Sequence, residues 1–320
     1  MTVKVAIIGL GIMGRRMLTH MKIHENYTPT YLWDPDVKSC QEAMKISPLS
    51  QIMETASQAI QAADLVYLAC PPTVRKDYAL EAAASGKALF LEKPFGIDLK
   101  ESEDLMRDLD NYDIPIAVNF TQAASSALNE LLEAKNHGDM GTLLGVDIVI
   151  NYSEWPRQWQ KEADWLRFKA EGGMTREVMS HFLFFSERVL GPLQIIWAKT
   201  TYPADTSLCE NAVLARLETR EGCGVNIMAS VGGAQPDRQE LTVKGSKSSR
   251  RIADFHKDSE STGGPFIPLR QEPEDPRALI LKRQLDDLYL NVKRQPNRLA
   301  TMHEAFRIQQ LVEGILSRSN

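Results

Sequence analysis

Three short patterns in this 320-residue chain combine residue types and spacings that could do chemistry. Residues 9–14 form a G-x-G-x-x-G run, Lys93 stands between a glutamate and a proline, and Glu177 lies four residues before His181. Backbone N–H groups in a glycine turn bind phosphate groups, and a lysine can stabilise negative charge that develops on an oxygen. A carboxylate one helical turn from an imidazole can hold one of its nitrogens. These patterns indicate nucleotide binding and transfer of a proton.

The elements around the glycine run favour a dinucleotide site. Residues 3–8 are an apolar run of strand length, and apolar residues at positions 13, 17, 18 and 21 predict a helix that begins as the glycines end. A glycine turn between a strand and a helix lets unpaired N–H groups at the helix N-terminus approach a pyrophosphate. The residues predicted to bind it are Gly9, Gly11, Ile12, Met13 and Gly14.

Asp34 ends the next predicted strand, residues 30–33, and lies 34 − 14 = 20 residues after the last glycine. A carboxylate there can accept hydrogen bonds from both ribose hydroxyls and repels a 2′-phosphate, so it favours NAD over NADP. The alternative is that Asp34 only helps to cap the following helix. Arg15 and Arg16 leave NADP open, because either could attract the extra phosphate.

Lys93 follows a second buried strand, residues 88–91, within the sequence Glu92-Lys93-Pro94. In an open α/β sheet, ligands bind at the edge formed by the carboxyl ends of the parallel strands. The strand therefore places Lys93 where a substrate would lie. The alternative is a charged turn that merely closes the strand.

The predicted fold is α/β, in two domains. In residues 1–120, strands alternate with helices, which predicts a doubly wound parallel sheet of the Rossmann type. In residues 121–320, long alternating segments without intervening helices predict an α+β domain with a largely antiparallel open sheet. These segments are residues 143–152, 193–200, 212–217, 224–231 and 239–244.

The C-terminal part of the chain completes the second domain. Residues 246–276 are rich in Ser, Gly, Pro and charge, so we expect a loop with little strand there. Residues 278–292 and 301–316 predict two helices that pack back toward the first domain.

Composition argues against several classes of protein. The formal charge is −5, 43% of the residues are hydrophobic and 25% are charged, with no basic block interleaved with aromatic residues. This pattern argues against nucleic-acid and membrane partners. The first apolar run is too short for a signal peptide. The cysteines lack zinc-ligand spacing, so we expect no metal and reduced thiols in a cytoplasmic protein; they are Cys40, Cys70, Cys209 and Cys223.

The segment leading to Lys93 resembles the Gfo/Idh/MocA family of NAD(P)-dependent oxidoreductases. A small-residue helix, the pair Gly86-Lys87, a strand and Glu92-Lys93-Pro94 follow one another in that family's register. The resemblance implies that Lys93 reaches the substrate oxygen, that the Lys93–Pro94 bond is cis, and that the second domain binds substrate and forms oligomer contacts. It also implies cofactor contacts after the third strand and within the signature, at Pro71, Pro72, Glu92 and Lys93.

A second signature of that family, a glycine pair followed by Asp, Gly and His, is similar to Gly172-Gly173 followed by His181. It implies that His181 is the catalytic base, with Glu177 as its orienting partner. Glu177 stands at the position of the family's Asp, and Met179 at that of its Gly.

Two further departures from the family pattern lie after the third strand, where Pro72 replaces an Asn and Arg75 replaces a His. Pro72 has no N–H, so a cofactor contact there must come from backbone carbonyls or from neighbouring residues. For Arg75, a solvated helix residue is favoured over a contact with phosphate.

Aromatic and cationic residues before His181 are further candidates for the substrate site. Trp155 and Trp165, with Trp159 between them, could stack on a sugar ring, although such aromatic residues more often pack in the interior. Arg167 or Arg176 could bind a substrate carboxylate, although a surface ion pair is favoured for each.

The expected reaction is reversible hydride transfer between a nicotinamide and the hydroxyl or carbonyl carbon of a sugar, polyol or related small substrate. His181 would take the hydroxyl proton and Lys93 would stabilise charge on the oxygen. The alternatives are a non-catalytic NAD(P)-binding sensor or co-repressor, and a dehydrogenase of imines or lactams. An open antiparallel face favours a homodimer or homotetramer.

Overall fold

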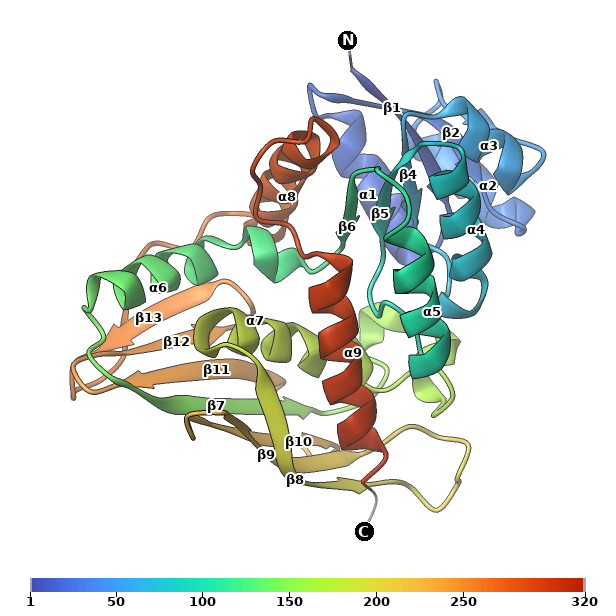
Figure 1. The fold of residues 1–320 in the computed structure, drawn as a ribbon. Helices are drawn as coiled ribbons and strands as arrows, with labels where there is room; N and C mark the ends of the chain where they lie inside the picture. Colours follow the sequence, from blue (N-terminus) through green and yellow to red (C-terminus); the bar gives the residue numbers. More distant parts are fainter. Residues whose placement is uncertain (1, 319–320) are drawn as a thin grey trace. The chain divides into compact units, whose positions relative to one another are not determined.

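The computed structural model describes residues 2–318, which form two compact units. The first unit runs through Thr121 and also contains Leu281–Arg307; the second contains Gln122–Ile280 and the residues from Ile308 onward (Figure 1). The second unit is therefore interrupted by residues 281–307. The sequence led us to expect a second domain over residues 121–320 whose C-terminal helices pack back toward the first.

A six-stranded parallel sheet forms the centre of the first unit, in the order β3-β2-β1-β4-β5-β6. The predicted doubly wound sheet is confirmed. Its strands β4 and β5 are buried along their whole length, as their continuous apolar runs require. The strands are β1 (Val3–Ile8), β2 (Tyr27–Trp33), β3 (Gln51–Ile52), β4 (Leu65–Leu68), β5 (Ala88–Leu91) and β6 (Ile116–Val118). The helices between them are α1 (Ile12–Lys22), α2 (Val37–Ile46), α3 (Ala56–Ala62), α4 (Pro72–Ala84) and α5 (Leu99–Leu109).

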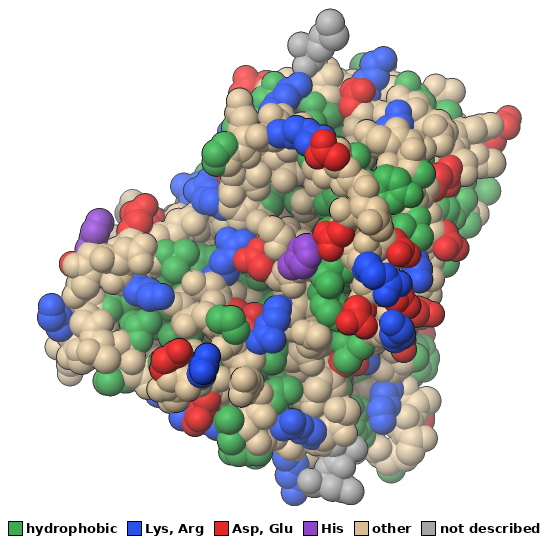
Figure 2. Space-filling view, viewed as in Figure 1, with side chains coloured by type: hydrophobic (Ala, Val, Ile, Leu, Met, Phe, Trp, Pro, Cys, Tyr) green, Lys and Arg blue, Asp and Glu red, His purple; other side chains and the backbone are tan. Residues whose placement is uncertain are grey.

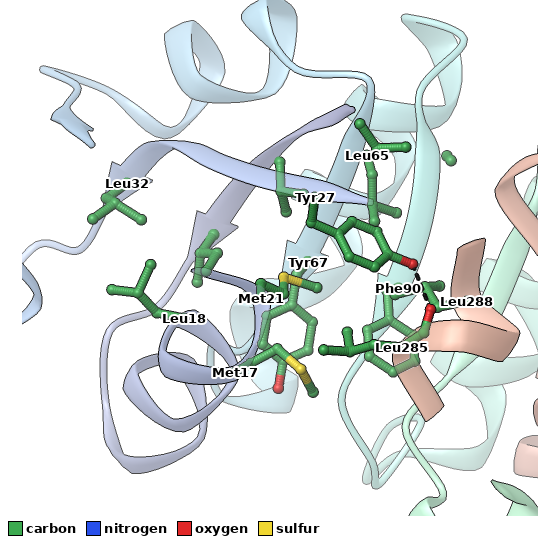
Figure 3. Packing of buried hydrophobic residues seen from close by; sticks show 14 of the residues in the cluster. Met17, Leu18, Met21, Tyr27, Leu32, Leu65, Tyr67, Phe90, Leu285 and Leu288 are labelled. Atoms are coloured by element: carbon green, nitrogen blue, oxygen red, sulfur yellow. Dashed lines mark hydrogen bonds between the residues drawn. The ribbon is translucent and has the colours of Figure 1, made fainter. Parts of the chain in front are cut away.

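Helix α8 (Pro276–Val292) contributes its later turns to the core of the first unit. Figure 3 shows Leu285 and Leu288 among side chains from α1 and from the sheet, including Tyr67 and Phe90. The hydroxyl of Tyr27 donates to the carbonyl of Leu285 at 2.8 Å. Burying a leucine side chain contributes about 1.5–3 kcal/mol, so α8 is held by its apolar face as well as by this bond.

An eight-stranded sheet forms the second unit, in the order β14-β13-β12-β11-β7-β10-β9-β8. Its pairs are antiparallel except for β10 with β7, which confirms the largely antiparallel sheet. The five predicted strands are present as β7 (Leu143–Tyr152), β8 (Leu193–Thr201), β9 (Ala212–Thr219), β10 (Gly224–Val231) and β11 (Arg238–Gly245). The helices of this unit are α6 (Ser126–His137), η2 (Gln158–Gln160), η3 (Asp164–Arg167), the π-helical η4 (Thr175–Met179) and α7 (Ser180–Leu190). The unit boundaries fall within η1 (Thr121–Ala124) and α9 (Met302–Leu316).

The expectation of a loop over residues 246–276 is wrong. The chain there forms β12 (Ser249–Ala253), β13 (Lys257–Ser261) and β14 (Ile267–Pro268). Arg250 and Asp258 face inward from β12 and β13 and form a buried ion pair, with 3.1 Å between Nε and Oδ1. The inner face of these edge strands is therefore partly ionic, and a search for apolar alternation overlooks it.

Charges are interspersed on the face of the molecule that Figure 2 shows, where acidic and basic side chains lie among each other rather than in patches of one sign. No helix within residues 2–318 is long and apolar enough to cross a membrane.

Truncation of Leu288 should destabilise the first unit. Leu288 is fully buried, so Leu288→Ala leaves a cavity and should lower the free energy of unfolding by about 2–5 kcal/mol in chemical denaturation. Leu279→Ala on the same helix is the control, since Leu279 is 38% exposed and should change the stability by about 0.5 kcal/mol or less. Equal losses for the two variants would contradict this packing.

Candidate functional site

The three glycines of the G-x-G-x-x-G run have different surroundings. A Cβ on Gly9, whose φ is +96°, would lie 2.6 Å from the backbone nitrogen of Cys70, and one on Gly14 would lie 1.9 Å from the carbonyl oxygen of Gly9. A Cβ on Gly11 would have nothing within 4 Å. The outer glycines thus allow close packing of the chain on itself, while Gly11 leaves space for a ligand beside the N-terminus of α1.

Ile12 and Met13 open α1 directly after Gly11, which supplies no capping side chain. The first N–H groups of a helix have no partner within the helix and carry its positive partial charge. The loop and the helix end together have the free N–H groups and the space that a pyrophosphate needs, and their binding of a dinucleotide stays a prediction.

Asp34 lies beside this loop at the end of β2. Its Oδ2 accepts a hydrogen bond from the Leu10 N–H at 2.6 Å, and its Oδ1 accepts one from the Asp36 N–H at 2.8 Å. Asp36, not Asp34, caps α2 through the N–H groups of its first turn. An ionised carboxylate has about four acceptor sites, so Asp34 keeps capacity for ribose hydroxyls.

Arg15 and Arg16 follow on α1. Arg15 donates to the carbonyl of Leu10 at 2.8 Å, and Arg16 donates to the sulfur of Met13 at 3.3 Å. Both side chains thus contact the glycine loop and the helix start next to it.

Arg75 is buried, with 2% of its surface exposed, so the prediction of a solvated helix residue is wrong. Its guanidinium donates to the carbonyls of Cys70 at 2.8 Å, Glu92 at 2.5 Å and Pro94. Burial lowers the pKa of Arg75, while Cys70 and then Glu92 oppose that shift. Because Glu92 and Pro94 flank Lys93, the arginine ties the end of β4 to the turn that carries the lysine.

Glu92 is almost fully buried, and its carboxylate accepts hydrogen bonds from the Tyr67 hydroxyl and from Asn119 Nδ2. Asn119 in turn accepts from Gln284 of α8 at 2.7 Å. Burial raises the pKa of Glu92, and the hydrogen bond from Tyr67 opposes the shift. The observed role of this carboxylate is to hold the turn, and Lys93 lies half-buried next to it.

The bond between Lys93 and Pro94 is cis, as the resemblance implied. Pro71 and Pro72 form the N-terminus of α4 and have no N–H to donate. Because the carbonyls at a helix start accept the first intrahelical bonds, polar contacts with a cofactor there come from neighbouring residues.

In the second unit, the glycine pair leaves space for a buried carboxylate that the sequence analysis missed. A Cβ on Gly173, whose φ is +108°, would lie 2.4 Å from Glu210 Oε2. Glu210 is 2% exposed and accepts a hydrogen bond from the Thr175 N–H at 2.7 Å. Burial raises the pKa of Glu210. In the sequence, only the glycine pair points to this carboxylate. Two glycines indicate that another group packs closely against the backbone, but they do not identify that group.

Glu177 and His181 lie on two kinds of helix. Glu177 is in the π-helical segment Thr175–Met179, and His181 is the second residue of α7, whereas their spacing of four residues suggested one turn of an α-helix. π-helical turns occur frequently at functional sites. Gln160 Nε2 donates to Glu177 Oε1 at 3.5 Å. The proposed partnership between Glu177 and His181 stays a prediction.

Phe255 is a second residue that the sequence analysis missed. Its ring meets the half-buried His181 ring edge-on, with centroids 5.5 Å apart, and stacks on Phe182 at 4.9 Å. Phe255 and the preceding Asp254 have φ values of +67° and +51°. These two residues form the turn between β12 and β13, where tight hairpins commonly require positive φ values, although a phenylalanine is uncommon in that conformation.

The two candidate arginines have structural partners. Arg176 is buried and pairs with Glu313 of α9 through two bonds of 2.7 and 2.8 Å. Arg167 forms an exposed pair with Asp164 at 3.2 Å. A surface ion pair was predicted for both, and this is correct for Arg167 only.

The three tryptophans differ in their surroundings. Trp155 donates its indole N–H to the carbonyl of Leu166 at 2.9 Å. Trp159 and Trp165 are 41% and 36% exposed, so a large part of each ring is accessible. Within residues 2–318 there is no group of three or more His, Cys, Asp or Glu side chains that could hold a metal ion.

A family model described as an oxidoreductase family with an NAD-binding Rossmann fold matches residues 3–120. The first unit accordingly carries an NAD-binding Rossmann domain.

Curated relatives and solved structures are similar to the chain at low identity. Glucose-6-phosphate 3-dehydrogenase of Bacillus subtilis is 22% identical over 165 residues, which are 50% of this chain and 47% of that protein. The chain spans about half the length of the curated relatives it matches. The WlbA dehydrogenase from Bordetella pertussis, in complex with NADH and UDP-GlcNAcA, has a TM-score of 0.82 at 17% identity, covering 100% of this chain and 96% of that chain. Myo-inositol 2-dehydrogenase from Lactobacillus plantarum has a TM-score of 0.81 at 16% identity, covering 100% and 98%. At these identities the two structures show a shared fold.

Substitutions of Gly11 and Gly14 should separate ligand binding from folding. The backbone of Gly11 has an ordinary φ of −66°, so Gly11→Ala should fold with unchanged stability yet weaken NADH binding about tenfold or more by crowding the phosphates. Gly14→Ala should instead cost about 1–3 kcal/mol of stability because its methyl group overlaps the Gly9 carbonyl. Thermal unfolding and NADH fluorescence titration measure the two effects. Unchanged NADH affinity in a folded Gly11→Ala would remove the glycine loop from the cofactor site.

Proposed function

We propose that this chain, whose N-terminal domain belongs to the Gfo/Idh/MocA family of oxidoreductases, transfers a hydride between a nicotinamide cofactor and a hydroxyl or carbonyl carbon of a sugar, polyol or related molecule. The observation that carries the proposal is the position of Lys93, held on both sides by Arg75 at the carboxyl end of β5 in the NAD-binding domain. Relatives named for glucose 6-phosphate, a UDP-sugar acid and myo-inositol support a carbohydrate or polyol substrate.

The cofactor contacts come from residues of the first unit. The glycine loop and the start of α1 bind the pyrophosphate, with Gly9, Gly11, Ile12, Met13 and Gly14 as its residues. Asp34 accepts the ribose hydroxyls and disfavours a 2′-phosphate, so NAD is preferred over NADP. Pro71 and Pro72, which follow β4 at the start of α4, lie at the same edge of the sheet. The nicotinamide, when bound, accepts or supplies the hydride.

Lys93 and His181 manage the charge and the proton at the substrate oxygen. During oxidation of an alcohol, His181 takes the hydroxyl proton as the hydride leaves the same carbon. Lys93 donates a hydrogen bond to that oxygen and stabilises the negative charge that develops on it. Glu177 fixes the tautomer and orientation of the imidazole. During reduction, the same groups return the proton to the oxygen.

A homo-oligomer is part of the proposal. The second unit exposes about half of each side chain of Ile196, Trp197, Leu214 and Met228, at 52%, 50%, 47% and 47%. Leu214 and Met228 are register partners on β9 and β10. An apolar patch of this kind marks protein interfaces. We therefore propose that homodimer or homotetramer contacts form on this sheet face.

The free thiols of all four cysteines are compatible with a cytoplasmic protein.

A charged residue at position 197 should disrupt such an oligomer. Trp197→Glu places a carboxylate in the apolar patch, and the molar mass measured by light scattering should fall to that of a smaller assembly. Leu49→Glu is the control and should keep the mass of the wild type, since Leu49 is 99% exposed and lies in the first unit, away from this sheet. A wild-type protein that is monomeric would contradict the oligomer proposal outright.

Removal of Lys93 or His181 should abolish turnover and spare cofactor binding. Lys93→Ala and His181→Ala should each lower kcat by about 10²–10⁴-fold with NADH affinity within about threefold of wild type. In His181→Ala the remaining activity should also lose the fall at low pH that a general base produces. Turnover is followed by NADH absorbance with a panel of polyols, aldoses, sugar acids, sugar phosphates and their keto forms.

Lys100→Ala and His137→Ala are matched controls, because both side chains are exposed on helices. Near-normal turnover in both Lys93→Ala and His181→Ala would overturn the assignment of these residues. NADH binding without turnover on any member of the panel would instead favour a sensor.

A further inference from the structure

Arg157 lies in a cluster of aromatic rings in the second unit. Its guanidinium carbon is 4.9 Å from the ring centroids of Tyr152 and of Trp159, and 5.8 Å from that of Trp155. A guanidinium over an aromatic face is attracted by the negative face of the ring. The three rings therefore restrict the position of the cation.

Gln160 fixes the guanidinium further and connects it to the segment that carries His181. Arg157 Nε donates to Gln160 Oε1 at 2.9 Å, and Gln160 is 1% exposed. The same side chain donates through Nε2 to Glu177 Oε1 at 3.5 Å. One continuous set of contacts thus runs from Arg157 to Glu177, four residues before His181.

The outer edge of this guanidinium is available to a ligand. An arginine carries five N–H donors, and Nε–H alone donates to a protein acceptor among residues 2–318. Other arginines of this unit are paired with carboxylates, Arg176 with Glu313 and Arg250 with Asp258. Arg157 is positioned by rings and an amide instead, which leaves its two terminal nitrogens for bonds that the chain itself does not supply.

A second arginine lies at the same aromatic cluster. The guanidinium carbon of Arg277 is 5.6 Å from the ring centroid of Trp159, which is 41% exposed. Because Arg157 and Arg277 both lie close to the accessible indole of Trp159, this part of the aromatic cluster is positively charged. Carboxylates lie elsewhere in the cluster. Glu177, Asp237 and Asp254 lie near Tyr152, whose pKa is raised first by burial and then by these charges, against the effect of Arg157.

We propose that Arg157 binds the negatively charged group of the substrate, and that the substrate is an acidic carbohydrate, bearing a carboxylate or a phosphate, rather than a neutral polyol. The planar fork of a guanidinium matches either group through two parallel hydrogen bonds. Two parallel bonds to Arg157 fix the charged group and thereby set the orientation of the sugar. This inference rests on the proposed function and specifies the substrate class of that site.

Binding of matched ligands to the NADH-bound protein tests the inference directly. Glucose, glucuronate and glucose 6-phosphate share one ring and differ in charge, and calorimetric titration measures their affinities without requiring turnover. The wild type should bind at least one of the two anions about 100-fold more tightly than glucose. The anion that binds identifies the group as carboxylate or phosphate.

Variants of Arg157 should remove this preference. Arg157→Gln should weaken binding of the preferred anion about 100-fold and leave the glucose affinity unchanged, while Arg157→Lys, which keeps the charge but not the fork, should restore part of it. In turnover the loss should appear in KM more than in kcat. Arg238→Gln is the control, since Arg238 is exposed and paired with Glu240. Melting temperatures show that each variant is folded.

The outcomes separate this inference from the proposed function. Equal affinity for glucose and both anions, or an Arg157→Gln variant that binds the anion normally, overturns the role of Arg157 while dehydrogenase activity stands. Anion binding that depends on Arg157 without any turnover supports the subsite and contradicts the proposed reaction. Failure of the wild type to bind either anion overturns the inference.

Discussion

The buried Arg75 guanidinium is the interaction on which the ligand-binding edge of the first unit depends. Removing a cation from water costs several kcal/mol unless protein groups replace its hydration. The carbonyls of Cys70, Glu92 and Pro94 do so, and the Glu92 carboxylate supplies opposite charge. Two of those carbonyls flank Lys93. The bonds that solvate the arginine therefore also immobilise the backbone of the lysine, and neither function can be lost alone.

In the second unit, buried polar groups likewise fix the chain just before α7, the helix that carries His181. Glu210, buried beside Gly173, accepts the N–H of Thr175, and Arg176 pairs with Glu313 of α9. Buried charged groups of either sign thus fix the π-helical segment from two sides. In both units the residues proposed to meet the substrate are half-buried, while the charges that position them are inside. This division gives a rigid support and an accessible reactive group.

The sequence predicted features whose cause is local or periodic. A glycine turn between a strand and a helix depends on neighbouring residues, and continuous or alternating apolar runs identified β5 and β7. The sequence did not predict the burial of Arg75. Two of the carbonyls that accept hydrogen bonds from its guanidinium lie 17 and 19 residues away, and every residue type has a backbone carbonyl, so residue types cannot identify them. The strands β12 and β13 were missed because an ion pair replaces apolar residues on their inner face. The sequence led us to expect that residues 278–292 pack back toward the first domain, but the partners of Leu285 and Leu288 come from distant segments, which periodicity does not reveal.

The π-helical segment has a consequence for the length of the chain. A π-helical turn holds about one residue more than an α-helical turn, because its hydrogen bonds join residues five apart rather than four. Deleting one residue from Thr175–Met179 would therefore allow an ordinary α-helical turn and leave the chain on either side in nearly the same direction. The imidazole of α7 would keep its contact with Phe255, but a deletion between Glu177 and His181 would shorten their spacing to three residues. A homologue one residue shorter at this point would thus keep the helix and lose the present relation between these two side chains.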